Sequence, residues 1–480
     1  MNRYLAEHVK RRQQWSTDKE PRVARLRRSR RYFHRQVDQL ISSLIVPNSY
    51  VLDLGCGDGT TLARCAADPG WGIDLDEAAV SVARENNSEM TFLNAPIEDL
   101  EDLPLPNPDY IVMSMLLDEV YDVQNVLGKV RYWSARPTRV MIVTYNRLWR
   151  PLILLAEKIG IKKRVEGENY VPWDEIENML AIEGFEVTKR LDGVLVPIHI
   201  PLIAPLINRW IAPLPLIRAL CLIRITVARS VERSSQPVQS VSVIVAARNE
   251  SGHIDELIGR VPMLAERQEL IFVEGNSNDD TWEVIQRAIA ERQHASPMEL
   301  VALQQPGKGK ADAVRVGFAR ATGDVLIILD ADISVPPEEL PLFVRALDDD
   351  RCEFANGSRL VYPMEAKAMR FLNILGNKFF GYLFSYLLGQ PIRDTLCGTK
   401  VLRRSDYDRI VANRDFFGDF DPFGDFDLLF GASRLGLKIR DVPVHYKERT
   451  YGETNISRFS HGWLLVRMSS VAAARLKFVG

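Results

Sequence analysis

The sequence predicts an α/β protein with two domains in tandem, and three stretches lead to this expectation. Residues 51–54, VLDL, are typical of a buried strand, and they run into a glycine-rich turn followed by a helical segment. After a short polar segment at residues 230–239, the alternation of apolar strands and amphipathic helices begins again. Residues 324–337, DVLIILDADISVPP, then form an apolar run that ends abruptly in two aspartates.

Length and composition agree with two globular domains. A prior of about 150 residues per domain gives two or three domains for a chain of 480 residues. The formal net charge of -2 gives no case for a nucleic-acid partner. The five cysteines form no CxxC pair, which favours a reducing compartment without structural zinc. We therefore divide the chain into a first domain at residues 1–229, a linker at 230–239 and a second domain at 240–480.

The N-terminal 40 residues lack the apolar core of a secretory signal and predict a basic helix, with RLRRSRR at residues 25–31. Such a helix could lie on anionic lipid or be a solvated face. Two apolar segments, 194–228 and 371–388, are interrupted by prolines or polar residues, so neither predicts a spanning helix. Both could lie in a membrane interface or belong to a soluble core. We expect a cytoplasmic protein, with peripheral binding to the inner face of the membrane as an open alternative.

The glycine-rich turn of the first domain has the composition of a cofactor-binding turn. It reads GCGDG at residues 55–59 and joins the predicted strand to a helix. Glycines at such a turn let a ligand approach the backbone, and the start of the helix offers free N–H groups. A second short strand at residues 70–74 ends in Asp74, where a carboxylate can hold a ribose diol in a doubly wound fold.

VLDLGCGDG followed by GIDLDEAAV resembles the class I S-adenosylmethionine-dependent methyltransferases, over about residues 31–229. The resemblance implies a seven-stranded Rossmann-like sheet that binds S-adenosylmethionine. By this resemblance, Asp53, Gly55 and Gly57 would line the methionine part of the cofactor and Asp74 would hold the ribose. The methyl acceptor is not predicted, and a first domain that only docks or senses is the alternative to an active methyltransferase.

Polar side chains follow consecutive strands of the second domain. Asn249 and Glu250 come directly after its first apolar strand, and Glu274 ends the next. Acids at these positions can hydrogen-bond a base or a ribose. Asp279 precedes a helix, where capping is its expected local role.

Two further motifs of the second domain suit phosphate and metal. PGKGKADA, at residues 306–313, places Lys308 and Lys310 in a glycine-rich loop at a helix start. Asp330 and Asp332 follow a buried strand at the carboxyl edge of the sheet, where two carboxylates can hold a divalent cation and, through it, a diphosphate. Because one residue separates the two acids, both can face one ligand only if the strand turns at this point.

The ordered blocks AARNE, EGNSNDDT, PGKGKADAV and LDAD resemble glycosyltransferase family 2, of the GT-A fold, over about residues 240–460. The blocks NGSR, RFLNILGN and DTLCGTK are similar to the branch of dolichyl-phosphate mannose synthase and polyprenyl-phosphate glycosyltransferases. The resemblance implies a Rossmann-like nucleotide-sugar-binding domain, with Mg²⁺ or Mn²⁺ held by Asp332 and with Asp330 against the ribose or a metal-bound water. The residues expected to bind the nucleotide sugar are Asn249, Glu250, Glu274, Asp279, Lys308, Lys310 and Asp330.

Two acceptors remain open for an inverting transfer. A hydroxyl acceptor needs a general base, for which Asp425 and Asp427 are the candidates. A polyprenyl phosphate, the leading hypothesis, is already anionic and needs no base, whereas cationic side chains would bind it. The candidates for binding that phosphate are Arg359, Arg393, Lys400 and Arg449.

Overall fold

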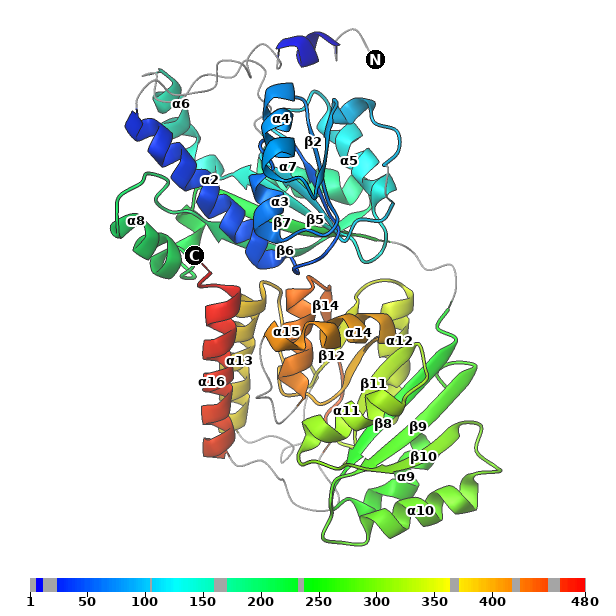
Figure 1. Cartoon of the computed structure of the whole chain (residues 1–480). Helices are drawn as coiled ribbons and strands as arrows, with labels where there is room; N and C mark the ends of the chain where they lie inside the picture. The colour runs from blue at the N-terminus through cyan, green and yellow to red at the C-terminus, as the bar shows by residue number, and fades with distance from the viewer. Residues whose placement is uncertain are drawn as a thin grey trace. The chain divides into compact units, whose positions relative to one another are not determined.

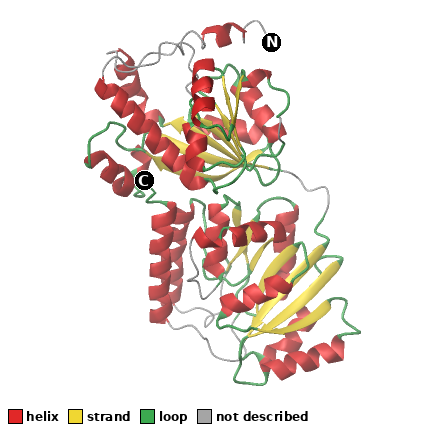
Figure 2. Cartoon of the chain, viewed as in Figure 1, coloured by secondary structure: helices red, strands yellow, loops and turns green. Residues whose placement is uncertain are grey.

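The computed structural model describes residues 6–11, 24–103, 106–158, 171–231, 237–362, 371–416, 424–447 and 458–479. The chain forms two compact units, residues 1–232 together with 476–480, and residues 233–475. Each unit contains one seven-stranded sheet with helices packed against it (Figures 1 and 2). The predicted fold class is thereby confirmed. Among the described helices, none combines the length and the apolar character that crossing a bilayer requires.

The sheet of the first unit has the strand order β3-β2-β1-β4-β5-β7-β6. Its strands are β1 (Val51–Leu54), β2 (Gly70–Asp74), β3 (Thr91–Asn94), β4 (Tyr110–Ser114), β5 (Arg139–Tyr145), β6 (Phe185–Gly193) and β7 (Ile223–Ser230). The first five strands run parallel, while β7 is antiparallel to both β5 and β6. The strand order reverses between β1 and β4, and ligands of open α/β sheets bind at the carboxyl ends of the strands at such a switch point.

Helices cover both faces of this sheet (Figure 1). They include α2 (Ala24–Leu44), α3 (Thr60–Cys65), α4 (Glu77–Asn86), α5 (Val123–Trp133), α6 (Arg150–Lys158) and α7 (Trp173–Ile182). Side chains alternate between the two faces along a strand. Val51 accordingly belongs to an apolar cluster with Phe33 of α2, whereas Leu52 belongs to a cluster with Leu127 of α5. By the same alternation, Asp53 is on the α2 side of β1.

The sheet of the second unit has the order β10-β9-β8-β11-β13-β12-β14. Its strands are β8 (Ser240–Ala247), β9 (Arg267–Glu274), β10 (Glu299–Gln304), β11 (Val325–Asp330), β12 (Phe354–Ser358), β13 (Lys400–Arg403) and β14 (Ile439–Pro443). Strands β10, β9, β8 and β11 run parallel, and β13 is antiparallel to both of its neighbours, β11 and β12. The switch point here lies between β8 and β11.

β11 is the central strand of the second unit because its apolar residues are fully enclosed. Residues 325–329 are at most 1% exposed and contribute to the apolar core. The strand ends at Asp330, and the next residues form a turn in which Ile333 has a φ of 54°. The helices of this unit include α9 (Ile254–Arg260), α10 (Thr281–Arg292), α11 (Lys310–Arg320), α12 (Leu340–Asp348), α13 (Phe371–Leu388), α14 (Arg404–Ala412), α15 (Asp425–Arg434) and α16 (Arg458–Leu476).

Candidate functional site

The glycine turn after β1 has open space beside its backbone. Gly55 and Gly57 have φ angles of 78° and 53°, which favour glycine. A Cβ atom built on Gly57 would meet no heavy atom of the described residues within 4 Å. The Gly57 N–H donates a hydrogen bond of 2.8 Å to Asp74 Oδ2, which joins this turn to the end of β2. A ligand could therefore lie against the backbone of this turn.

Asp53 is a buried carboxyl group at this turn. It is 1% exposed, and its Oδ1 atom has no hydrogen-bond partner among the described residues. Burial, together with the nearby carboxylates of Asp38 and Asp74, raises the pKa of Asp53 to about 8. A cationic group beside Asp53 would favour the ionised form. S-adenosylmethionine carries a sulfonium and an amino group, so the orphaned carboxyl oxygen and the open glycine turn fit that cofactor.

Asp74 ends β2, as the sequence predicts. Its Oδ1 atom accepts a hydrogen bond of 2.8 Å from the Asp76 N–H, while Oδ2 accepts the bond from Gly57. An ionised carboxylate has about four acceptor positions, so Asp74 can also accept bonds from two hydroxyl groups. The predicted contact with a ribose is compatible with this geometry.

The second candidate site lies where β8, β9 and β11 end. In these parallel strands Ala246 pairs with Asp330, and Ala247 pairs with Glu274. The two acids therefore end the strands on either side of β8, and Asn249 follows β8 by two residues. Three widely separated motifs thus meet at one edge of the sheet.

Hydrogen bonds join the loops that follow β8 and β9. The Asn249 N–H donates to Ser277 Oγ at 3.0 Å, and Asn249 Oδ1 accepts from the Asn278 N–H at 2.8 Å. Glu274 Oε1 accepts from the Ser277 N–H. Asn249 and Glu274 therefore hold in place the surface on which the sequence predicts the nucleoside.

Glu250 and Asp279 stabilise this region through local bonds. Glu250 is buried, and its Oε2 atom lies 2.9 Å from His253 Nδ1. Asp279 Oδ1 accepts from the backbone N–H of Thr281 at 3.1 Å and from its hydroxyl at 2.5 Å. Partial burial acts to raise the pKa of Asp279, but bonds from Thr281 and Ser251 lower it overall. Both acids thus have structural partners, and their contact with a nucleotide stays a prediction.

Asp330 lies among cationic side chains. Lys310 Nζ, from the first residue of α11, is 2.7 Å from Asp330 Oδ1. Burial acts to raise the pKa of Asp330, but Lys310, Arg359 and Lys400 hold it below its usual value. Gly398 packs so closely on this carboxylate that a Cβ atom there would collide with Asp330 Oδ2. The result is a fixed carboxylate with an excess of positive charge around it, which suits a diphosphate.

The glycine-rich loop before α11 carries the two predicted lysines. Lys310 is bound to Asp330, whereas Lys308 is exposed. The Gly307 N–H donates a bond of 2.9 Å to Asp312 Oδ2, which closes the loop onto the first turn of α11. The loop therefore positions one lysine at the carboxylate and presents the other to solvent.

Asp332 lies in the turn beyond β11. The alternation of side chains between the two faces of a strand therefore does not force Asp330 and Asp332 onto opposite faces. Its Oδ1 atom accepts a bond of 3.1 Å from the Ser334 N–H. Within the described ranges, no three His, Cys, Asp or Glu side chains converge on a metal position. Mg²⁺ is often held by one or two carboxylates together with substrate phosphates. The donor set of Asp330 and Asp332 fits a cation shared with a diphosphate.

Arg359 is paired with a buried acid. Its Nε and Nη2 atoms donate to Asp394 Oδ2 and Oδ1 at 2.7 and 2.9 Å, and Asn377 Nδ2 adds a bond of 2.8 Å to Oδ1. Burial acts to raise the pKa of Asp394, but Arg359 lowers it to about 2. The structure thus gives Arg359 a structural role, and only its remaining N–H groups could serve the predicted phosphate contact.

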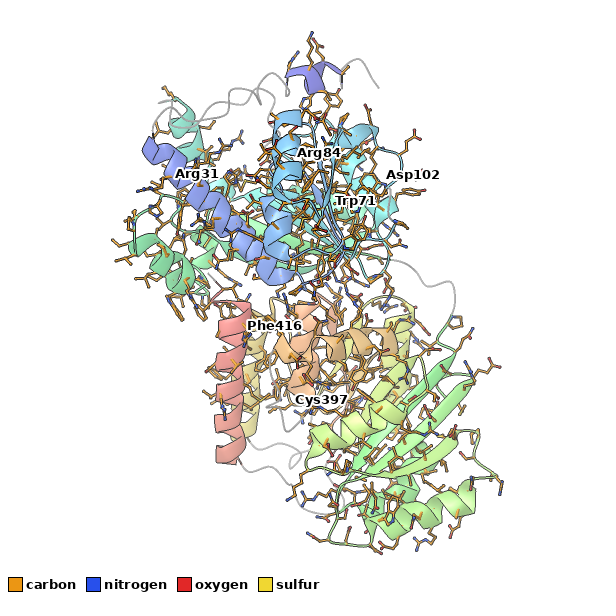
Figure 3. All side chains as sticks on the ribbon, viewed as in Figure 1. Arg31, Trp71, Arg84, Asp102, Cys397 and Phe416 are labelled. Atoms are coloured by element: carbon orange, nitrogen blue, oxygen red, sulfur yellow. The ribbon has the colours of Figure 1, made fainter. Side chains whose placement is uncertain are left out.

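The other predicted phosphate ligands differ in accessibility. Arg393 has an exposed side chain. Lys400 is 0% exposed, and its Nζ atom donates to the carbonyl oxygen of Cys397, which Figure 3 labels. Because it is enclosed, Lys400 acts on the site through its charge and does not reach a ligand directly. Arg449 lies outside the described residues.

Asp427 is engaged by two arginines. Its Oδ2 atom accepts a bond of 2.9 Å from Arg414 Nε and one of 3.5 Å from Arg315 Nη2, and the residue is 9% exposed. Asp427 therefore has structural partners, and its role as a general base stays a prediction.

Asp425 is the first residue of α15, and its side chain lies outside the described part of the chain. The preceding Gly424 has a φ of 74° and packs on α11, where an added Cβ atom would lie 2.9 Å from Ala311 Cα. The start of α15 is therefore adjacent to the start of α11, which carries Lys310. This neighbourhood keeps Asp425 as a candidate for a contact with the acceptor.

Sequence reasoning assigned no role to Asp394, Asn377 or Tyr446. Asp394 and Asn377 complete the Arg359 pair, and the Arg359 guanidinium carbon lies 5.0 Å from the centre of the Tyr446 ring. The available signal was an acid in the block DTLCGTK and two amides in the block RFLNILGN, which otherwise read as a loop and an apolar helix. Such a signal does not identify the arginine that completes the pair.

Comparisons with known proteins agree with two different domains. Residues 25–190 match the family model described as a methyltransferase domain, and residues 242–411 match glycosyl transferase family 2. The undecaprenyl-phosphate 4-deoxy-4-formamido-L-arabinose transferase of Enterobacter sp. (strain 638) is 27% identical over 228 residues. That match covers 46% of this chain and 64% of the relative, so the chain spans less than two thirds of the relative's length.

Two solved structures each match about half of the chain. An S-adenosylmethionine-dependent methyltransferase of Thermotoga maritima is 16% identical, with a TM-score of 0.35, and the match covers 46% of this chain and 98% of that one. The glucosyl-3-phosphoglycerate synthase of Mycobacterium tuberculosis is 20% identical, with a TM-score of 0.35, and the match covers 50% of this chain and 80% of that one.

Proposed function

We propose that this chain, in which a methyltransferase domain is joined to a glycosyl transferase family 2 domain, transfers a sugar from a nucleotide sugar to a polyprenyl phosphate. The observation that carries the proposal is the Asp330 carboxylate surrounded by Lys310, Arg359 and Lys400. A nucleoside diphosphate gains negative charge as its bond to the sugar breaks, and fixed cations stabilise that charge. The same charges favour the approach of an anionic acceptor.

Asp332 and Asp330 would hold Mg²⁺ or Mn²⁺ together with the diphosphate. Once bound, such a cation offsets the negative charge of the leaving group. Lys310 keeps Asp330 ionised, and Lys308 extends from the same loop as a second cation. Asn249 and Glu274 would bind the nucleoside portion, because their loops are fixed to each other beside Asp330. Attack from the opposite side of the sugar would invert its anomeric carbon.

An apolar stripe on α13 supports a lipid acceptor. Leu375, Phe379 and Tyr382 are exposed at spacings of four and three residues, so they share one side of the helix. Asn377, on another side, is buried and bonded to Asp394 beside Arg359. A polyprenyl chain could contact the stripe while its phosphate reaches the cationic site. The name of the Enterobacter relative includes undecaprenyl phosphate, which also supports this acceptor class.

Product analysis tests this reaction. The purified chain is incubated with a panel of radiolabelled sugar nucleotides, Mg²⁺ or Mn²⁺, and polyprenyl phosphate, and the products are partitioned between solvent and water. We expect a metal-dependent, lipid-linked sugar that is lost in Asp332→Asn and kept in Asp408→Asn, an exposed acid of the same unit. A product found only in water would overturn the lipid acceptor.

A hydroxyl acceptor on a polysaccharide or metabolite is the second candidate. The observation that favours it is the position of Asp425 at the start of α15, beside the α11 residue that follows Lys310. With a hydroxyl acceptor, Asp425→Asn would abolish turnover, because a general base would be lost. With a phosphate acceptor, the same variant would retain turnover and its rate would not follow the titration of a carboxylate.

The first domain would bind S-adenosylmethionine through Asp53, Gly55, Gly57 and Asp74. Calorimetry tests this: binding that is lost in Gly55→Arg supports a cofactor site, and an absence of binding supports a docking or sensing module. We propose residues 1–229 and 240–480 as the two domains, with 230–239 as the linker. A polyprenyl phosphate acceptor would place the protein as a peripheral protein at the cytoplasmic face of a membrane.

A further inference from the structure

A proline-rich insertion between β6 and β7 exposes an extended apolar surface. The insertion, residues 194–222, includes α8 (Ile203–Leu206) and contains no Asp or Glu. Leu202 and Leu216 are 80% and 88% exposed. Ten large apolar side chains of the insertion are exposed in all: Ile198, Ile200, Leu202, Ile203, Leu206, Trp210, Ile211, Leu214, Leu216 and Leu220. A concentration of exposed apolar side chains in one segment is typical of an interaction site.

Polar contacts fix the inner side of the insertion. Asn208 accepts from the Val196 N–H at 2.8 Å and donates to the Val196 carbonyl at 2.9 Å, and it also donates to Tyr32 Oη of α2 at 2.9 Å. Near the other end, Trp149 Nε1 donates to the Leu220 carbonyl at 2.8 Å. The exposed side chains are therefore presented by an ordered segment.

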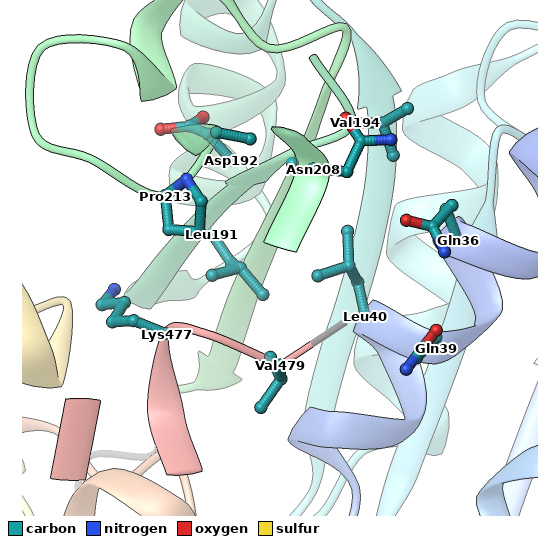
Figure 4. Close-up of a pocket in the computed structure, with 12 residues that line it drawn as sticks. Gln36, Gln39, Leu40, Leu191, Asp192, Val194, Asn208, Pro213, Lys477 and Val479 are labelled. Carbon is teal, nitrogen blue, oxygen red and sulfur yellow. The ribbon is translucent and has the colours of Figure 1, made fainter. Parts of the chain in front are cut away.

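The hollow beneath the insertion is small. Figure 4 shows Asn208 and Pro213 of the insertion facing Leu40 and Gln36 of α2 across a small hollow. Its volume is about 10 Å³, which accommodates about one water molecule. The hollow is too small to bury an apolar side chain of the insertion, so it does not account for the exposed leucines.

The apolar surface continues onto the segment tied to it by Trp149. Leu148 and Leu152 are exposed by 62% and 57%, and Leu154 and Leu155 each by 52%. They belong to residues 147–155, a 3₁₀ turn followed by α6. We call residues 194–222 and 147–155 together the apolar face.

Exposed arginines lie within the apolar face and on the neighbouring helix α2. Arg209 in the insertion is exposed, as are Arg147, just before α6, and Arg150, its first residue. Helix α2 is bonded to the insertion, because Ser29 Oγ accepts from the His199 N–H at 3.2 Å. The helix exposes arginines at helical spacing, at positions 28, 31 and 35, and Figure 3 labels Arg31.

Apolar side chains bordered by arginines match the boundary between acyl chains and anionic headgroups. Trp210, with the Arg209 guanidinium carbon 5.3 Å from its ring centre, is the type of side chain enriched at that depth. A second copy of this chain docked on the same face would bring arginines against arginines, which disfavours it. At the surface of an anionic bilayer, the leucines can contact acyl chains and the arginines can contact headgroups.

We propose that the apolar face docks on the surface of an anionic bilayer, with its leucines in the interface and the arginines of α2 at the headgroups. The site lies on the methyltransferase unit and does not depend on the proposed sugar transfer. An enzyme with a water-soluble acceptor could still bind a bilayer in this way. The failure of one proposal would therefore leave the other in place.

Vesicle flotation of the full chain, without sugar nucleotide, tests the proposal. The probes are phosphatidylcholine vesicles with and without phosphatidylglycerol. We expect binding to the vesicles that contain phosphatidylglycerol, weakening as salt rises. Leu202→Glu and Leu216→Glu should each lower the affinity by about tenfold, because each removes a buried leucine from the bound state. The matched control is Tyr132→Glu, since Tyr132 of α5 is 74% exposed but lies outside the apolar face.

The outcomes separate the possible partners. Loss of binding in the two leucine variants, with Tyr132→Glu unchanged and circular dichroism unaltered, supports the bilayer site. Absence of vesicle binding by the native chain overturns it. Equal loss in all three variants also overturns it, because the effect would then follow from added negative charge alone. If light scattering shows dimers that only the leucine variants dissociate, the face binds a second copy instead.

Discussion

Lys310 Nζ lies 2.7 Å from Asp330 Oδ1, and this pair joins the start of α11 to the end of β11. The two side chains are 27% and 29% exposed, so solvent screens the pair only in part. Arg359 and Lys400 act on the same carboxylate from other elements. The positive charge at the end of β11 is therefore fixed in the structure, and it would stabilise the leaving group of the proposed reaction without reorganisation.

Removal of the Lys310 charge should slow transfer more than it destabilises the fold. We expect Lys310→Met to reduce the transfer rate by about 10²-fold, the order seen when one preorganised charge is lost. The free energy of unfolding should change by less than about 1 kcal/mol, because the pair is partly exposed. Transfer assays and urea denaturation measure the two effects, with Arg345→Met on α12 as the control for an exposed cation. Equal loss of rate in both variants would contradict this role for Lys310.

The Arg359–Asp394 pair should contribute strongly to the stability of the second unit. Asp394→Ala leaves a buried guanidinium without its acid, so we expect a loss of about 3–5 kcal/mol in the free energy of unfolding. The matched control is Glu338→Ala, which removes a similar fork from Arg260 at 2.8 and 3.0 Å on the surface. That variant should cost less than about 1 kcal/mol. Chemical denaturation measures the loss of unfolding free energy in each variant. Similar losses in both variants would argue against a structural role for the Arg359–Asp394 pair.

Gly57 should be needed for cofactor binding, because its backbone is open to a ligand and has a positive φ. We expect Gly57→Ala to lower the affinity for S-adenosylmethionine at least tenfold and to destabilise the unit by about 1 kcal/mol. Gly128→Ala is the control, since Gly128 is inside α5 with Glu183 Oε2 at 3.4 Å as the nearest contact. Calorimetry with both variants is the measurement. Unchanged affinity in Gly57→Ala would exclude the glycine turn as the binding surface.

The fold could be predicted from the sequence because strand periodicity and turn chemistry agree along the chain. The strand expected before Asn249 forms at Ser240–Ala247, and the strand expected to end at Glu274 forms at Arg267–Glu274. The start of β7 is not marked in the sequence, because it lies at Ile223, inside the apolar segment 194–228. An apolar run gives no signal at the point where exposed leucines give way to a strand.

The carboxyl-edge acids could also be predicted, because parallel strands bring their ends together. The partners of the charged residues could not. Asp427 meets Arg315 and Arg414, and Arg359 meets Asp394, through contacts between elements far apart in the sequence. A sequence motif indicates that a charge is present, whereas its role depends on whether tertiary packing buries it with an opposite charge.

Asp53 should make the stability of the first unit depend on pH. Its native pKa of about 8 lies above the value of about 3.9 expected in the unfolded chain. Between these values the native carboxyl group keeps a proton that the unfolded one has lost, so stability falls as pH rises from about 4 to about 8, and the dependence ends above 8. One proton corresponds to about 1.4 kcal/mol per pH unit.

Asp53→Asn should flatten this dependence, because an amide resembles the neutral carboxyl group and does not titrate. Urea denaturation at several values between pH 5 and pH 8 measures the slope in the native chain and in the variant. Asp99→Asn, at an exposed acid of the same unit, should keep the native slope. If Asp53→Asn and the native chain lose stability in parallel as pH rises, Asp53 is already ionised in the folded protein.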